Sequence, residues 1–216
     1  MHLGNDLVRI VENSFVETHS EIVCEFDKKK GSIIASHFVS KIGATIYQQC
    51  FSQEAGYALN GLNISEDGKW SHKDFLVDCS ITNMTPIVSK AKQKVISVHS
   101  SMSVAIESVG DPGLISFGKH FGKLLCIKSD NCLFLNAVNQ RTKSRRTQYI
   151  DHRLNQMLQL LNSQPAVSTA FYVVFWPSPH DHLWDNFSKE ILVNWIEAYE
   201  ITQNRQTLKY EFKKLT

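Results

Sequence analysis

Two acidic side chains stand at the ends of apolar segments that have the composition of buried β-strands. Asp74 precedes the segment FLVDCSI, and Glu107 follows the apolar triplet VAI. Mg²⁺ binds proteins through one or two carboxylates together with water and substrate phosphate, and neighbouring strands can bring two such acids to one point. Asp74 and Glu107 are therefore candidate metal ligands and catalytic residues. The alternative for both is a solvated or salt-bridged acid with no further role.

Asp78 is a secondary candidate for the same site. It lies four residues after Asp74 within the same apolar segment. Positions i and i+4 of a strand lie on one side of the sheet, so the two acids would share a face. A solvated acid is again the alternative.

Short motifs between residues 71 and 107 resemble the PD-(D/E)XK nuclease superfamily, in particular its small bacterial branches. The pattern is S-x-x-D before an apolar run, then T-P-hydrophobic, then an apolar strand ending in A-I-E. Its residues here are Ser71, Asp74, Thr85, Pro86, Ile87, Ser101, Ile106 and Glu107. The resemblance implies an α/β fold with a central mixed β-sheet flanked by helices, a restriction-endonuclease-like core. It also implies a Mg²⁺-dependent endonuclease acting on DNA or RNA, with Asp74 and Glu107 as metal ligands.

Two positions depart from the superfamily pattern. Val109 stands where the pattern places a lysine, and Ala35 stands where a helix of such nucleases often carries another acid. A lysine from a neighbouring element can reach the same point, and Lys119 and Lys123 follow the strand closely enough to be catalytic candidates. If neither does, the chain is a catalytically inactive pseudo-nuclease that serves as a nucleic-acid-binding or protein-assembly subunit.

A basic segment, RTKSRRTQYIDHR, lies further along the chain. Cationic side chains at a helix entrance can follow a phosphate backbone and add salt-sensitive affinity that does not depend on base sequence. The alternative is a solvated basic loop. The candidate nucleic-acid-binding residues are Arg141, Lys143, Arg145 and Arg146.

Composition narrows the class of protein. A chain of 216 residues that is 43% hydrophobic and 20% charged predicts one α/β domain over residues 1–216. The net charge of +2 is too small to indicate a polyanionic partner by itself. Five cysteines without a C-x-x-C pair favour a reducing cytoplasm over a disulfide framework. No signal peptide or membrane-length apolar run is present, so we expect a cytoplasmic protein with no membrane partner, as a possible homo-oligomer or part of a larger assembly.

Several chemistries are disfavoured because their motifs are missing. The sequence contains no phosphate-binding G-x-x-x-x-G-K-S/T loop, no G-x-G-x-x-G, no G-x-S-x-G and no H-E-x-x-H. A third hypothesis is a protein-interaction module that uses the aromatic end around Trp176, Trp184 and Trp195.

Hydrophobic periodicity predicts the elements that would position these residues. Apolar residues recur at helical spacing in residues 7–15, 32–50, 144–164 and 185–201, which predicts four helices. Strands are predicted at 74–81, 103–108, 132–138 and 168–176. We expect Pro86 to break the segment around it, and the polar residues 99–101 to separate two strands. Strands that alternate with helices favour an α/β sandwich.

Overall fold

The computed structural model describes residues 3–25, 31–51, 56–61, 63–64, 70–71, 77–89, 94–110, 113–163, 169–180, 183–204 and 206–215. Its helices are α1 (Gly4–Glu25), α2 (Gly31–Cys50), α3 (Leu114–Cys126), α4 (Lys143–Asn162), α5 (Leu183–Asn186) and α6 (Lys189–Val193). Its strands are β1 (Tyr57–Gly61), β2 (Asn63–Ile64), β3 (Trp70–Ser71), β4 (Cys79–Ser89), β5 (Lys94–Val109), β6 (Ser129–Val138), β7 (Ala170–Pro177), β8 (Glu197–Gln203) and β9 (Tyr210–Lys214).

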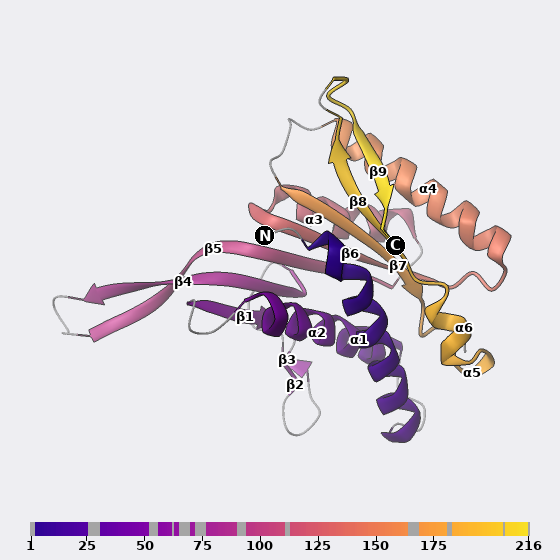
Figure 1. The fold of residues 1–216 in the computed structure, drawn as a ribbon, viewed down its shortest axis with the longest axis horizontal. Helices are drawn as coiled ribbons and strands as arrows, with labels where there is room; N and C mark the ends of the chain where they lie inside the picture. The colour runs from indigo at the N-terminus through magenta and orange to yellow at the C-terminus, as the bar shows by residue number, and fades with distance from the viewer. Residues whose placement is uncertain are drawn as a thin grey trace.

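A mixed β-sheet forms the centre of the described fold (Figure 1). Seven strands are hydrogen-bonded in the order β1-β4-β5-β6-β7-β8-β9, and β2 pairs separately with β3. The pairs β5–β6 and β6–β7 are parallel, with α3 and α4 as their crossover helices, and the other pairs are antiparallel. The predicted α/β class, with a central mixed sheet flanked by helices, is confirmed.

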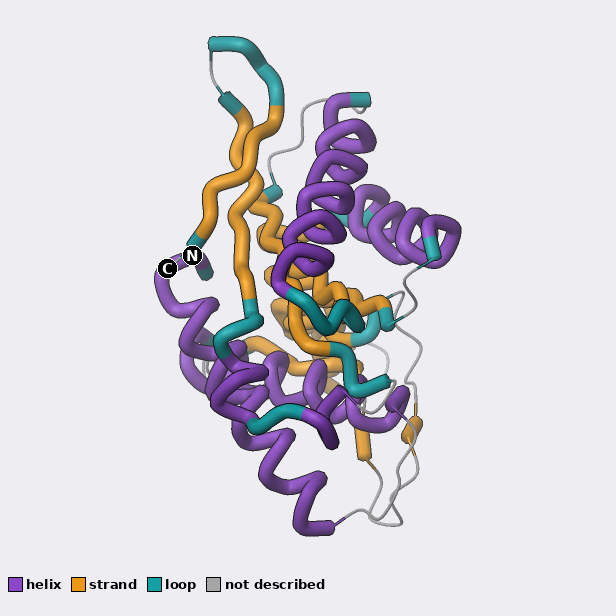
Figure 2. Tube along the Cα trace, turned by 90° about the vertical axis from the view of Figure 1, so that its right-hand side faces the viewer, coloured by secondary structure: helices purple, strands orange, loops and turns teal. Residues whose placement is uncertain are grey.

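Helices cover both faces of the sheet (Figure 2). The face toward α1 and α2 buries Leu133 and Leu135, whereas the face toward α3 and α4 buries Phe134. This alternation explains why β6 and β7 are almost continuously apolar, since a strand buried on both faces has no solvent side.

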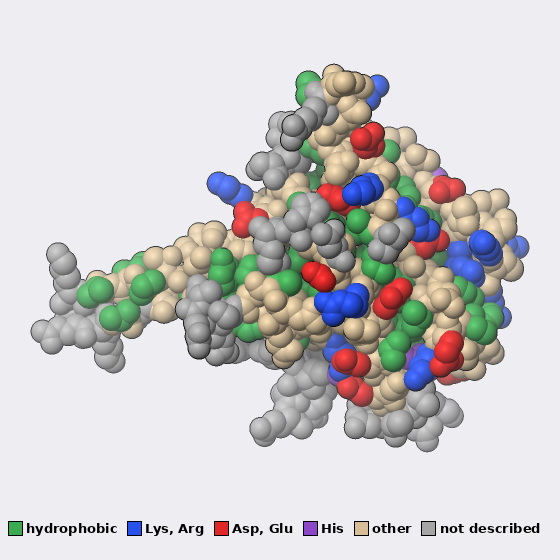
Figure 3. Space-filling view, viewed as in Figure 1, with side chains coloured by type: hydrophobic (Ala, Val, Ile, Leu, Met, Phe, Trp, Pro, Cys, Tyr) green, Lys and Arg blue, Asp and Glu red, His purple; other side chains and the backbone are tan. Residues whose placement is uncertain are grey.

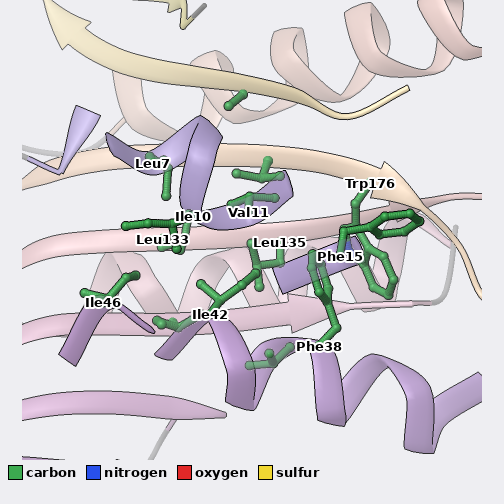
Figure 4. Close-up of a cluster of buried hydrophobic side chains, with 14 of the residues drawn as sticks. Leu7, Ile10, Val11, Phe15, Phe38, Ile42, Ile46, Leu133, Leu135 and Trp176 are labelled. Atoms are coloured by element: carbon green, nitrogen blue, oxygen red, sulfur yellow. The ribbon is translucent and has the colours of Figure 1, made fainter. Parts of the chain in front are cut away.

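The packing of α1 and α2 follows from helical spacing. In α1 the side chains of Leu7, Ile10, Val11 and Phe15 are fully buried, and they point toward the sheet and α2 (Figure 4). Residues three or four apart share one side of a helix, so this spacing produces a single apolar stripe. The predicted helices at 7–15 and 32–50 are confirmed within α1 and α2.

The prediction that Pro86 breaks its segment is wrong. β4 continues through Pro86, which is paired with Ser97 of β5. β1 pairs only with residues 79–83 of β4, so among the described strands Pro86 lies on an outer edge. A missing backbone donor is tolerated at such an edge.

The prediction that residues 99–101 separate two strands is also wrong. β5 is continuous from Lys94 to Val109, and its polar residues His99, Ser100 and Ser101 are exposed on the ribbon. Beyond the part of the sheet flanked by β1 and β6, residues 84–89 and 94–100 project as a two-stranded ribbon, here named the β4–β5 arm (Figure 1).

The predicted closing helix at 185–201 is wrong, since this range contains two short helices and the start of β8, which forms a hairpin with β9. β8 pairs with the exposed edge of β7, from Phe171↔Ile201 to Phe175↔Glu197. The backbone bonds at this edge outweigh the helical spacing of the sequence, because strand formation depends on the available neighbour more than on local preference.

Candidate active site

Glu107 is a buried acid in the middle of an apolar strand face. It stands on β5 between Ala105 and Val109, which belong to the apolar cluster under α3 and α4. The Glu107 side chain is 0% exposed. A carboxylate in this position loses its hydration, so it must be stabilised by partners within the protein.

Two of these partners come from α3. Nζ of Lys123 donates to Oε1 of Glu107 at 2.6 Å, and Nδ1 of His120 lies 2.5 Å from the same oxygen. His120 and Lys123 are three residues apart and therefore adjacent on the helix surface. They flank the stripe that anchors α3 in the core, formed by Phe117, Phe121 and Leu124.

The second carboxylate oxygen of Glu107 has a different environment. Oε2 is buried and has no hydrogen-bond partner among the described residues. Loss of hydration raises the pKa of Glu107 above its ordinary value of 4.5, and the negative charge of Asp78 raises it further. The hydrogen bonds from Lys123 and His120 oppose this shift without cancelling it. A buried acid whose pKa is raised by loss of hydration and by a neighbouring like charge is typical of a functional site.

Asp78 lies beside this carboxylate, immediately before the neighbouring strand β4. Cys79 of β4 is paired with Ile106 of β5, so the antiparallel register places the preceding Asp78 opposite Glu107. Oδ2 of Asp78 accepts hydrogen bonds from the backbone N–H and the hydroxyl of Ser108, at 2.8 and 2.6 Å. These two bonds fix the orientation of the Asp78 carboxylate next to Glu107.

The predicted site residues separate into three groups. The structure brings Glu107, Lys123 and the secondary candidate Asp78 together, whereas Lys119 is exposed on α3. Val109, at the lysine position of the superfamily pattern, is 3% exposed and belongs to the core. Asp74 lies outside the described residues.

His120 and Ser108 are the site residues that the sequence analysis missed. His120 had a recognisable signal, because its spacing of three residues from Lys123 places both on one flank of an amphipathic helix. Ser108 had none, since its role depends on a partner thirty residues away in the chain.

The donor set is suited to a hard divalent cation that keeps several waters. Among the described residues, no group of three or more His, Cys, Asp and Glu side chains could hold a metal by itself. Mg²⁺ needs fewer protein ligands, because water and substrate phosphate complete its coordination. The unpartnered Oε2 of Glu107 and the adjacent carboxylate of Asp78 fit this requirement.

The basic segment begins α4, where the hydroxyl of Thr142 accepts the backbone N–H of Arg145 as a helix cap. Arg141, Lys143 and Arg145 are exposed there. Arg146 instead lies with its guanidinium carbon 3.7 Å from the centre of the Trp195 ring, and donates to the carbonyl of Arg141. Phosphate binding by all four remains a prediction, and Arg146 has a structural role as well.

We expect Arg146→Ala to lower the free energy of unfolding by about 1 kcal/mol, because it removes the stacking on Trp195 and two main-chain hydrogen bonds. Arg145→Ala is the matched control, since Arg145 is exposed and should change stability by less than about 0.5 kcal/mol. Urea unfolding followed by circular dichroism measures both values. Equal effects of the two substitutions would contradict a structural role for Arg146.

The aromatic end of the chain is not an exposed surface. Trp176 is 1% exposed and Trp184 is 9% exposed, both within the core next to Phe15 and Phe38. Trp195 is half-buried and contacts Arg146 and Phe187. Trp176 and Trp184 therefore offer no exposed surface to a partner, and an interaction module at this end of the chain stays a prediction.

Comparisons of the chain with protein-family models, with curated proteins and with solved structures found no match. None of the helices in the described segments combines the length and apolar character needed to cross a membrane.

Proposed function

We propose that the protein is a metal-dependent nuclease whose site comprises Asp78, Glu107 and Lys123. The observation that supports this most strongly is the contact between Lys123 and the fully buried Glu107. In this proposal, the lysine that the PD-(D/E)XK pattern places at position 109 is supplied by α3 instead. Asp78 takes the part that the sequence pattern assigned to Asp74.

The order of elements also supports the proposal. Glu107 lies on β5, Asp78 immediately precedes its antiparallel neighbour β4, and the next helix, α3, leads to the parallel strand β6. This arrangement agrees with the restriction-endonuclease-like core that the resemblance implies. It also explains how a residue of α3 reaches β5, since a crossover helix packs back across the strand that precedes it.

Each residue would have a distinct role in phosphodiester hydrolysis. Asp78 and Glu107 would hold Mg²⁺, which when bound supplies an activated water and stabilises charge on the phosphate. The ammonium group of Lys123 would stabilise negative charge that develops on the phosphate oxygens. His120 also contacts Oε1 of Glu107, from the same flank of α3 as Lys123, and Ser108 orients Asp78.

A catalytically inactive pseudo-nuclease is the second candidate. It is favoured by one observation, the burial of Val109 in the core where the pattern places its lysine. Under this hypothesis Lys123 and His120 only neutralise Glu107, and the chain contributes a nucleic-acid-binding or assembly surface.

We expect purified protein to cut DNA or RNA in the presence of Mg²⁺ or Mn²⁺, and Asp78→Asn to reduce the rate at least about 100-fold. Gel electrophoresis of plasmid DNA and of a labelled RNA measures this rate. Asp185→Asn is the matched control, because Asp185 is an acid of α5 that does not belong to the proposed site. Full activity of Asp78→Asn would contradict the site. Absence of cutting with both metals and both substrates would favour the pseudo-nuclease.

A further inference from the structure

The β4–β5 arm carries apolar side chains that no other part of the described chain covers (Figure 3). Ile87 is 47% exposed, Val88 is 65% exposed and Val95 is 66% exposed. Val88 is paired directly with Val95, so these two project from one face, while the adjacent Ile87 projects from the other. The arm is therefore apolar and exposed on both faces.

A two-stranded ribbon of this kind is poorly stabilised by itself in water. A partner that buries all three apolar residues must contact both faces, because each face has an exposed large apolar residue. A groove with two walls meets this condition, whereas a flat protein surface covers one face only. The major groove of B-form DNA is about 12 Å wide and admits a two-stranded β-ribbon.

The charge of this region is complementary to nucleic acid. The chain contains 21 acidic residues, yet none lies between positions 79 and 106, where the only charged residue type is lysine. A stretch without acidic side chains avoids electrostatic repulsion from the phosphates on either wall of a groove.

The β4 edge of the arm is also protected against pairing with another β-strand. Pro86 lacks a backbone donor on this edge, and the β4–β5 register shifts at Asn83/Met84, where the arm begins. Proline and bulges are the features by which exposed strands avoid edge-to-edge association. They disfavour a second copy of the chain as the partner.

We propose that the β4–β5 arm inserts into the major groove of duplex DNA, with Ile87, Val88 and Val95 contacting the bases or the groove walls. In the major groove, apolar side chains can contact the methyl group of thymine. This inference rests on the proposed function, since both concern nucleic acid. β5 continues from the arm to Glu107, and Asp78 immediately precedes β4 at that same end, so DNA that follows these strands away from the arm would run toward the site.

The test is fluorescence anisotropy with a labelled DNA duplex in EDTA, where cleavage cannot contribute. The triple variant Ile87→Ser/Val88→Ser/Val95→Ser should bind DNA at least about tenfold more weakly than the wild type. Ile191→Ser is the matched control, because Ile191 is 46% exposed on α6, away from the arm, and should bind within about twofold of the wild type. Circular dichroism verifies that each variant is folded.

Several outcomes would overturn the inference. Unchanged affinity of the triple variant, or no binding by the wild type at low salt, would exclude the arm as a DNA-binding element. Light scattering could instead show a dimeric wild type and a monomeric triple variant with the same DNA affinity. That result would identify the arm as a self-association surface. Binding through the arm without any cleavage would retain the inference and reject the proposed nuclease activity. Cleavage that does not require the arm would support the nuclease activity and reject the inference.

Discussion

Glu107→Gln is expected to abolish metal-dependent cleavage and to leave the protein at least as stable as the wild type. The substitution keeps the shape of the side chain but removes the charge that would hold Mg²⁺ with Asp78. We expect the cleavage rate to fall below about one thousandth of the wild-type rate, because both metal binding and charge stabilisation are lost.

The stability effect follows from the pKa of Glu107, which burial and the charge of Asp78 raise above 4.5. A raised pKa in the folded state means that the native protein binds this proton more tightly than the unfolded chain does. The stability from protonated Glu107 is therefore complete below the unfolded pKa and is lost as pH rises through the folded pKa. Glutamine remains neutral, so the advantage of the variant should grow over this range and then level off.

Thermal unfolding between pH 4 and pH 8 measures this effect, and an advantage of about 1 kcal/mol would raise the Tm by roughly 2–4 °C. Glu197→Gln is the matched control, because Glu197 also accepts a lysine hydrogen bond at 2.6 Å, from Lys214. Its pKa is lowered despite burial, through hydrogen bonds from Lys214 and Tyr199, so its substitution should reduce stability at neutral pH. Destabilisation of both variants would indicate that Glu107 forms an ordinary structural ion pair.

Lys123→Met is expected to reduce both cleavage and stability. Methionine fills a similar volume but leaves the buried Glu107 carboxylate with His120 as its remaining side-chain partner in the described structure. Removing one member of a fully buried ion pair costs roughly 3–5 kcal/mol, and we expect about 2 kcal/mol here because Lys123 is 36% exposed. The cleavage rate should fall at least about 100-fold, as for other lost charge-stabilising groups.

The double variant Lys123→Met/Glu107→Gln separates the structural from the catalytic part of this effect. It should recover most of the stability lost in Lys123→Met, since no buried charge remains, while staying inactive. Urea unfolding and the plasmid assay provide the two measurements. Lys119→Met is the control, because Lys119 is exposed on the same helix and should retain both activity and stability. Wild-type cleavage by Lys123→Met would exclude this lysine from the site.

Local sequence patterns predicted much of the fold and part of the site. Helical spacing in α1, α2 and α4 and the apolar runs in β6 and β7 could be recognised directly, because these patterns determine which side of an element is buried. Glu107 stood out for the same reason, as an acid within an apolar run. Lys123 was one of two lysines near enough in the chain to reach it.

The tertiary structure decided the elements and residues that depend on distant partners. β8 forms a strand because the edge of β7 is available to it, although its own sequence has helical spacing. Asp78 is placed opposite Glu107 by the register of β4 on β5, and the burial of α3 selects Lys123 over Lys119. Periodicity reports which face of an element is apolar, whereas strand register and helix docking depend on contacts between residues far apart in the chain. The sequence by itself therefore identified a buried acid and candidate cations, and only the folded chain placed His120, Lys123 and Asp78 around it.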